Sequence, residues 1–408
     1  MDYYLLTDMA AQIGYELAVS GAETFRIEET MRRVLAAYGI CCETFAIPNC
    51  VMVSLEADNG KPLMVMKRVG FHGNDLDAVE RLNALSRRIC AETPDPAVAA
   101  QWLEEAKKSH RRYPAHVYYL GNFLAAAGFC PVFGGTLRDS LWAGLMGLII
   151  GFVSRQLEKV EMNPFFSTIT SAFAMAVPAY LIAAFGLIDY ADAVIISSLM
   201  ILVPGLLITN SMRDIIYGDT NSGVNRIVQV LLSALAIAMG TAAAWHITAP
   251  LYGRTTASTL SYPFWFQAIA IAVACTGFVI LFNVRGWGRS LCALGGVVTW
   301  MTYLLCLSLG LDVYGANFLA AAVAAAYAES MARVRKYPVT SYQVISVVPL
   351  LPGAGIYYTM SLGLTGNTQL ALQKGFETAG VAGSIAAAIL LISSVVRLLV
   401  TQRRNRTK

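Results

Sequence analysis

Long apolar runs follow one another along the chain from about residue 115 onward. Ten of them approach the roughly 20 residues that an α-helix needs to cross the hydrocarbon core of a bilayer. The predicted membrane helices cover residues 115–133, 137–153, 165–187, 193–211, 224–247, 264–284, 290–309, 313–333, 339–362 and 378–400. The pattern therefore predicts a polytopic α-helical membrane protein.

Residues 1–110 show the shorter spacings of water-soluble elements. Apolar positions recur every three or four residues in the first stretch, residues 2–19, which predicts an amphipathic helix. Further helices are expected at 24–38, capped by Thr24, and at 76–90 and 96–109, with β-prone runs at 43–47, 50–56 and 63–69. We therefore expect a small α+β domain that ends near residue 110.

Two of the predicted membrane helices contain a proline followed by a glycine. Pro204-Gly205 interrupts the fourth helix, and Pro352-Gly353 interrupts the ninth, 148 residues later. An interior proline removes a helix hydrogen bond and glycine adds backbone freedom, so each pair breaks or kinks its helix. Broken helices at corresponding places of two halves are typical of a transporter's binding site. The alternative is that membrane helices simply tolerate these residues.

Other landmarks recur at nearly the same interval. Gly128 recurs as Gly277, 149 residues later, each followed by phenylalanine, and Arg226, which opens the fifth predicted helix, corresponds to Lys374 before the tenth. An interval this steady indicates duplication. Each half then holds five helices, an odd number, so the second half enters the membrane inverted.

The predicted fold is a 5+5 inverted repeat preceded by the α+β domain. The expected domains are residues 1–110, a first five-helix repeat at 111–252 and a second at 253–408. In such a repeat the two broken helices run antiparallel and can meet near the middle of the membrane.

Composition and charge support this assignment. Of the 408 residues, 56% are apolar and only 14% are charged. Residues 1–110 carry 11 basic and 16 acidic side chains, whereas the rest of the chain carries 19 and 10. No secretory signal opens the chain, so the first domain should stay in the cytosol.

With that domain inside, basic side chains gather in the inner loops and the C-terminal tail. This bias predicts a protein of the cell (inner) membrane with both termini in the cytosol. The inner side chains are Arg155, Lys159, Arg213, Arg226, Arg285, Arg289, Arg333, Arg335, Lys336, Arg403, Arg404, Arg406 and Lys408, against Arg254 and Lys374 outside.

Three short segments are distinctive: residues 20–30 (SGAETFRIEET), 203–205 (VPG) and 348–353 (VPLLPG). With them, nearly the whole chain resembles the threonine/serine exporter family. The resemblance implies an antiporter that exports threonine and serine, or dicarboxylates as in some two-chain relatives, by alternating access driven by the proton-motive force. It implies a small-molecule substrate, protons and the lipid bilayer as partners, no nucleic acid and no cofactor, and it leaves a homo-oligomer open.

The residues at and just past each break are the candidates for substrate binding. The N-terminus of a half-helix attracts a carboxylate, and unwound carbonyl groups attract an ammonium group or a cation. Alternatively, the polar side chains there only bridge neighbouring helices. The candidates are Pro204, Gly205, Thr209, Asn210, Pro352, Gly353, Tyr357 and Tyr358.

Five charged residues are candidates for coupling and gating. Arg213 and Asp214 are adjacent on a helix, so they should have different partners, and they form an inner gate or a topological anchor. Arg226 is expected near the inner face and Lys374 near the outer one, as a gate on each side requires. Glu377 lies within ion-pair reach of Lys374, and burial can keep such a carboxyl group neutral, which suits a proton carrier. A plain interfacial ion pair is the alternative.

Enzymatic chemistry finds little support in the chain. The four histidines are His72, His110, His116 and His246, and none has the spacing of a metal-binding helix or an obvious Ser or Cys partner. The eight cysteines include no CxxC pair, which favours ordinary reduced thiols and no metal site. A membrane-anchored enzyme would need a catalytic cluster in residues 1–110, and a membrane scaffold or sensor is the third class.

Overall fold

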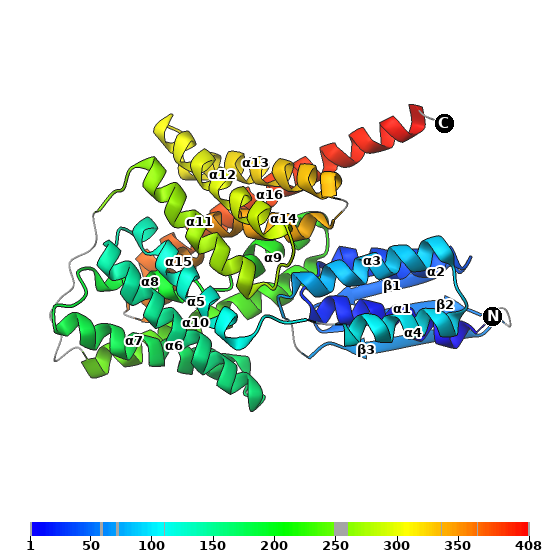
Figure 1. The fold of residues 1–408 in the computed structure, drawn as a ribbon, viewed down its shortest axis with the longest axis horizontal. Helices are drawn as coiled ribbons and strands as arrows, with labels where there is room; N and C mark the ends of the chain where they lie inside the picture. Colours follow the sequence, from blue (N-terminus) through cyan, green and yellow to red (C-terminus); the bar gives the residue numbers. More distant parts are fainter. Residues whose placement is uncertain are drawn as a thin grey trace. The chain divides into compact units, whose positions relative to one another are not determined.

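The computed structural model describes residues 2–57, 60–70, 73–109, 111–248, 260–335, 337–364 and 366–406. The chain forms two compact units. The first comprises Met1–Tyr113 with Phe282–Arg285, and the second comprises Pro114–Leu281 with Gly286–Lys408 (Figure 1).

The first unit contains four helices and one antiparallel sheet of strand order β1-β2-β3. Each element lies on a run of residues whose pattern predicts it. The elements are α1 (Tyr3–Val19), α2 (Thr24–Ala37), β1 (Cys42–Ile47), β2 (Cys50–Glu56), β3 (Pro62–Arg68), α3 (Leu76–Glu92) and α4 (Pro96–Lys108).

One predicted cap in this unit is wrong. Thr24 is the first residue of α2 and is buried, so its side chain does not cap the helix; the N-cap is Glu23, which makes no side-chain capping bond. An N-cap residue needs an extended backbone, and Glu23 has it (φ −67°, ψ 142°).

The core of the first unit lies between the helices and one face of the sheet. Period-two alternation buries Val51, Val53 and Leu55 of β2 against Ile13 of α1 and the other core residues. The opposite face of the sheet leaves large apolar side chains exposed, namely Phe45, Met64 and Met66.

The second unit is helical. Its elements are α5 (Ala115–Phe129), η1 (Pro131–Phe133), α6 (Leu137–Lys159), α7 (Pro164–Ala184), α8 (Ala191–Leu199), α9 (Gly205–Tyr217), α10 (Thr220–Thr248), α11 (Phe264–Leu281), α12 (Gly288–Ser308), α13 (Val313–Arg335), α14 (Val339–Val347), η2 (Val348–Leu350), α15 (Gly353–Leu364) and α16 (Thr368–Arg406). All ten predicted segments contain helix.

Among the described residues, six helices are long and apolar enough to cross a membrane, and the number is seven when the bent pair formed by Val339–Leu350 and Gly353–Gly363 is counted as one span. The pair bends by 49°. The other predicted spans are shorter or less apolar; α5, for example, has only 15 residues. The chain is therefore a polytopic helical membrane protein.

Both predicted helix breaks are present. α8 ends at Leu199 and α9 begins at Gly205, with Pro204 as its N-cap residue. α14 passes into the short turn η2, and α15 begins at Gly353 directly after Pro352. In both cases the proline precedes the first residue of the second helix, where its missing N–H costs no hydrogen bond.

The tenth predicted segment begins too late. α16 starts at Thr368 rather than at residue 378, so Lys374 and Glu377 lie inside this helix instead of before it. The polar composition of residues 368–377 hides the helix from a search for apolar runs, although nothing in it breaks a helix.

Several sequence-based expectations lie outside the described residues. They are the boundary between residues 252 and 253, the 1–110 boundary residue His110, and the side chains of His72, Arg254, Lys336, Arg403, Arg404, Arg406 and Lys408.

Helices α5 and α11 pack in a reciprocal way. Gly128 of α5 lies against the backbone of Ala274, and Gly277 of α11 lies against the backbone of Ala125, so closely that a Cβ atom on either glycine would overlap its neighbour. Gly277 lies 149 residues after Gly128, and Ala274 lies 149 residues after Ala125. The two contacts therefore join equivalent pairs of residues with the two helices exchanged.

Candidate functional site

The two helix breaks lie against each other in the second unit. A Cβ atom on Gly205 would lie 2.8 Å from Leu351 Cβ, and one on Gly353 would lie 3.0 Å from a Val203 methyl group. The two contacts are reciprocal, because Gly353 lies 148 residues after Gly205 and Leu351 lies 148 residues after Val203. A Cβ atom at Gly205 would overlap Leu351, and one at Gly353 would be in tighter than ordinary contact with Val203, so glycine at both positions lets the breaks approach this closely.

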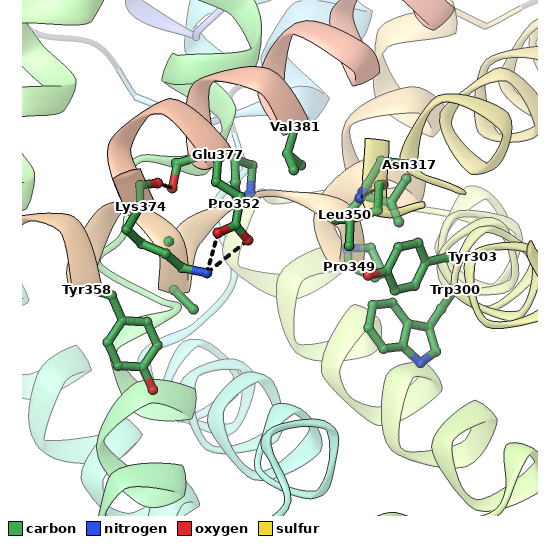
Figure 2. A pocket seen from close by; sticks show the side chains of 14 residues that line it. Trp300, Tyr303, Asn317, Pro349, Leu350, Pro352, Tyr358, Lys374, Glu377 and Val381 are labelled. Atoms are coloured by element: carbon green, nitrogen blue, oxygen red, sulfur yellow. Dashed lines mark hydrogen bonds and ion pairs between the residues drawn. The ribbon is translucent and has the colours of Figure 1, made fainter. Parts of the chain in front are cut away.

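A cavity of about 210 Å³ opens beside the second break. At about 30 Å³ for each water molecule, it has room for roughly seven waters or a small metabolite. Figure 2 shows its polar and aromatic walls. The cavity is lined by Trp300, Tyr303, Val313, Asn317, Pro349, Leu350, Pro352, Ala354, Gly355, Tyr358, Lys374, Glu377, Thr378 and Val381.

The start of α15 forms one wall of this cavity. Pro352, Ala354 and Gly355 line it, and the first backbone N–H groups of a helix have no partner within that helix. These groups carry the positive end of the helix dipole. Gly355 also lets α16 approach, because a Cβ atom there would collide with the Thr378 hydroxyl. The wall can therefore hold an anionic group.

An ion pair on α16 forms the second wall. The Lys374 ammonium group lies 2.9 and 3.0 Å from the two carboxylate oxygens of Glu377, one helical turn away. Both side chains are partly exposed, 35% for Lys374 and 43% for Glu377. A pair with this exposure contributes little to stability, so either partner can be given up to a ligand at small cost.

Aromatic side chains close the opposite side. The rings of Trp300 and Tyr303, one turn apart on α12, lie 5.1 Å apart, and the Trp300 indole donates to Gln267 Oε1 at 3.1 Å. Tyr358 lies on the far side of the ion pair (Figure 2). Asn317 of α13 is buried and donates to the Val313 carbonyl at 2.8 Å.

The structure brings four of the predicted site residues to this cavity: Pro352, Tyr358, Lys374 and Glu377. The others lie elsewhere in the described chain. Thr209 is buried and donates to the Gly205 carbonyl at 3.3 Å, Asn210 is half-buried on α9, and Tyr357 packs on the core of the first half. Pro204, Gly205 and Gly353 form the contact between the breaks.

The predicted gating residues of the first half form a buried pair. Arg226 Nε of α10 donates to Asp214 Oδ2 of α9 at 2.9 Å, and the two side chains are only 9% and 12% exposed. Arg213 is half-buried on the same helix as Asp214. Removing either member of a buried pair leaves an uncompensated charge, so this contact fixes α9 to α10 firmly.

Sequence reasoning missed the residues that unbroken helices bring to the cavity. Trp300 and Tyr303 come from α12, and Asn317 comes from α13. No local signal marks them. Thr378, by contrast, follows Lys374 by four residues and donates to its carbonyl at 2.6 Å, so the helical period could have found it.

Comparison with known proteins identifies the family of the chain. A family model described as "Putative threonine/serine exporter" matches residues 8–248, and one described as "Threonine/Serine exporter, ThrE" matches residues 267–395. The chain belongs to the threonine/serine exporter family. The chain is thus a membrane exporter, and the family names describe transporters rather than enzymes.

Two curated relatives support the assignment. A "Threonine/serine exporter" of Corynebacterium glutamicum is 26% identical over 96% of this chain and 82% of its own length. A "Probable threonine/serine exporter" of Mycobacterium tuberculosis is 22% identical over 86% of this chain and 68% of its own length. No solved structure matches the chain.

Proposed function

We propose that this exporter carries threonine and serine, and that the cavity beside the second break is its substrate site. The observation that carries the proposal is that groups of opposite charge line one small cavity. The positive start of α15 and Lys374 stand beside the carboxylate of Glu377. An amino acid carries the same two charges, so it can exchange partners with the ion pair.

The expected binding mode follows from these groups. The Gly353 N–H already donates to the Leu351 carbonyl at 2.7 Å, so the substrate carboxylate accepts hydrogen bonds from the N–H groups of Ala354 and Gly355 and from Lys374, as anions do at helix starts. The substrate ammonium group donates to Glu377 and lies against the face of Trp300, which attracts cations. The side-chain hydroxyl of the substrate lies near Asn317 and Thr378.

A dicarboxylate fits this cavity less well. A succinate-type substrate has two anionic ends and would place one of them near Glu377, where like charges repel. Among the residues that line the cavity, Lys374 is the one cationic side chain, and it is already paired. The charges therefore favour a zwitterion over a dianion.

We further propose that the second unit is a 5+5 inverted repeat. Reciprocal contacts support it, because a pseudo-two-fold axis requires that contacts between equivalent residues occur twice. Phe129 and Phe278 are equivalent by the 149-residue shift, and their rings contact each other 5.9 Å apart, as residues on such an axis do. The helix that follows each break also packs on a helix of the other half: α9 packs on α16, and α15 packs on α10.

The two halves differ in one respect that suits alternating access: a cavity lies beside Lys374 in the second half, and a buried ion pair holds Arg226 in the first. With the N-terminus in the cytosol, the cavity near Lys374 lies towards the outer face, and the equivalent region near Arg226 lies towards the inner face. There Asp214 and Arg226 form a buried ion pair. We propose that this is the outward-open state, that the pair is the inner gate, and that Glu377 exchanges the coupling proton.

The placement in the cell membrane rests on the basic inner loops. Arg155, Lys159, Arg285 and Arg289 all lie in or beside connections on the side assigned to the cytosol. The α+β unit lies on the same side in this arrangement.

Counterflow into liposomes tests the substrate directly. Purified protein is reconstituted into liposomes loaded with unlabelled threonine, serine or succinate, and uptake of labelled threonine is followed. We expect threonine and serine inside to drive uptake and succinate to drive none. Uptake of labelled succinate against succinate, without threonine counterflow, would establish the dicarboxylate alternative.

A further inference from the structure

The indole ring of Trp300, which lines the cavity, is held by a residue that does not line it. The indole N–H donates to Gln267 Oε1 of α11 at 3.1 Å. Figure 2 shows the indole nitrogen at the end of the ring that is turned away from the Lys374–Glu377 pair. The χ2 torsion of a tryptophan is broad and roughly two-fold. A hydrogen bond to the single indole N–H therefore selects one orientation of the ring.

Both ends of the Gln267 amide are engaged. Its Nε2 atom donates to the Tyr262 carbonyl at 2.9 Å, while its Oε1 atom accepts from Trp300. An indole N–H is a donor only, so it needs the amide oxygen and cannot use the amide nitrogen. The bond to Tyr262 thus turns the amide so that its oxygen faces Trp300. Gln267 is itself held in the orientation that holds the ring.

Tyr262 is anchored in turn to the first half of the second unit. Its hydroxyl donates to the Gly135 carbonyl at 3.0 Å, and its ring stacks on that of Phe266 with the centroids 4.5 Å apart. A Cβ atom on Gly135 would overlap the Cys130 sulfur, so this carbonyl belongs to a closely packed turn between η1 and α6. Three hydrogen bonds in series therefore connect Trp300 to this turn.

The Tyr262–Gly135 bond has a counterpart at the equivalent residues. Within the first unit, Tyr113 donates to the Val284 carbonyl at 2.9 Å; each of these residues lies 149 positions from its equivalent. In the proposed inverted repeat, the two access states arise when the halves exchange conformations, so a contact that both halves already make can persist. Gln267 is thus attached to a contact that we expect to stay fixed during transport.

The Gln267–Trp300 bond has no such counterpart. A shift of 149 residues places Tyr118 where Gln267 stands and Gly151 where Trp300 stands. Gly151 has no side chain to hold, and it lies directly against the Asn122 amide. A bond that served only the packing of the repeat would be expected in both halves. This bond occurs in the half that contains the cavity, which indicates a role at the site.

We propose that Gln267 is a positioning residue of the substrate site, because it holds the Trp300 ring with one face towards the substrate ammonium group. The inference deepens the proposed function and rests on it. The face of an aromatic ring attracts a cation within about 6 Å of the centroid, whereas the ring edge is positive and repels it. A ring fixed in the favourable orientation binds the cation more tightly, because no orientational freedom is lost on binding.

A simple bridge between α11 and α12 is the other role that a membrane glutamine can have. A bridge contributes to the stability of the fold and leaves the affinity for substrate unchanged. A positioning residue changes the affinity, and it does so only through the ring that it positions. Binding, transport and thermal unfolding of the same variants therefore separate the two roles.

Gln267→Met is the first variant, because methionine keeps the length of the side chain and removes both hydrogen bonds. Equilibrium binding of labelled threonine to the purified protein should weaken about 3- to 10-fold. In liposomes the KM for threonine should rise by a similar factor, with a near wild-type rate at saturating threonine. The matched control is Gln229→Met on α10; Gln229 is also half-buried but donates to Asn225 of its own helix at 2.8 Å, so this variant should bind as the wild type does.

A double-mutant cycle with Trp300→Phe decides whether Gln267 acts through the indole. Phenylalanine removes the N–H, so Gln267→Met should weaken binding no further in this background. An equal loss in both backgrounds, or a lower unfolding temperature of Gln267→Met with unchanged affinity, would overturn the positioning role and leave the proposed function intact. Wild-type affinity in Trp300→Phe would overturn both this inference and the place of Trp300 in the proposed binding mode.

Discussion

At the scale of single residues, the chemistry of the proposed site rests on one ion pair that is only half-buried. Lys374 and Glu377 satisfy each other when no substrate is present, at distances of 2.9 and 3.0 Å. Because solvent reaches both groups, the exchange of either partner for a substrate group costs little. The Asp214–Arg226 pair is the opposite case, since it is buried and expensive to break.

Replacing Glu377 with glutamine tests its role in proton coupling. The amide keeps the size of the side chain but cannot carry the proton, so efflux of threonine from liposomes should lose its dependence on an imposed pH gradient. Counterflow, which needs no net proton movement, should persist at a reduced rate. Arg333→Gln serves as the control for a changed surface charge, and unaltered proton dependence in Glu377→Gln would remove this residue from the coupling role.

Some of the residues that line the cavity could be predicted from the sequence and others could not. Lys374, Glu377 and Tyr358 could be predicted because they follow a helix break or pair at helical spacing. Trp300 and Asn317 reach the cavity only because α13 packs beside α16 and α12 packs beside α13. Side chains on unbroken apolar helices look alike in a single sequence, so the packing decides which of them face the cavity.

At the scale of elements, the two breaks and the glycines around them organise the second unit. The breaks could be predicted because Pro and Gly act locally on the backbone. The contact between Gly205 and Leu351, repeated between Gly353 and Val203, brings both breaks to one place. The early start of α16 could not be seen, because its first turns are polar and lie beyond the apolar run that marks the span.

Replacing Pro204-Gly205 or Pro352-Gly353 with two alanines should abolish export while the protein stays in the membrane. Alanines favour a continuous helix, and a Cβ atom at either glycine would press on the opposite break at 2.8–3.0 Å. Efflux of threonine from cells loaded with a threonine-containing dipeptide measures this, with immunoblots for the amount in the membrane.

The matched control is Gly363→Ala on α15. A Cβ atom there would meet Ala371 at 4.0 Å, an ordinary contact, so export should remain near the wild-type rate. Normal efflux from both double variants would contradict the role of the breaks.

At the scale of the whole molecule, the proposed topology places the α+β unit and both termini in the cytosol. Cysteine accessibility can test this, because all eight cysteines are free. Cys41 is exposed, whereas burial raises the pKa of the Cys42 and Cys90 thiols and leaves less of the reactive thiolate at neutral pH.

A membrane-impermeant maleimide should therefore label Cys41 in inside-out vesicles and leave it unlabelled in intact cells. Phe185→Cys, placed in the exposed connection between α7 and α8, should show the reverse pattern. Cys41→Ser identifies the label on Cys41, and labelling of Cys41 from outside intact cells would invert the proposed topology.

The claim that the cavity at the start of α15 holds the substrate is tested most directly by equilibrium binding of labelled threonine to the purified protein. Lys374→Gln removes a charged hydrogen bond to the substrate carboxylate, worth about 1.5–3 kcal/mol, and should weaken binding about 10- to 100-fold. Arg333→Gln should bind as the wild type does. If Lys374→Gln and Glu377→Gln both bind threonine with wild-type affinity, the substrate site lies elsewhere.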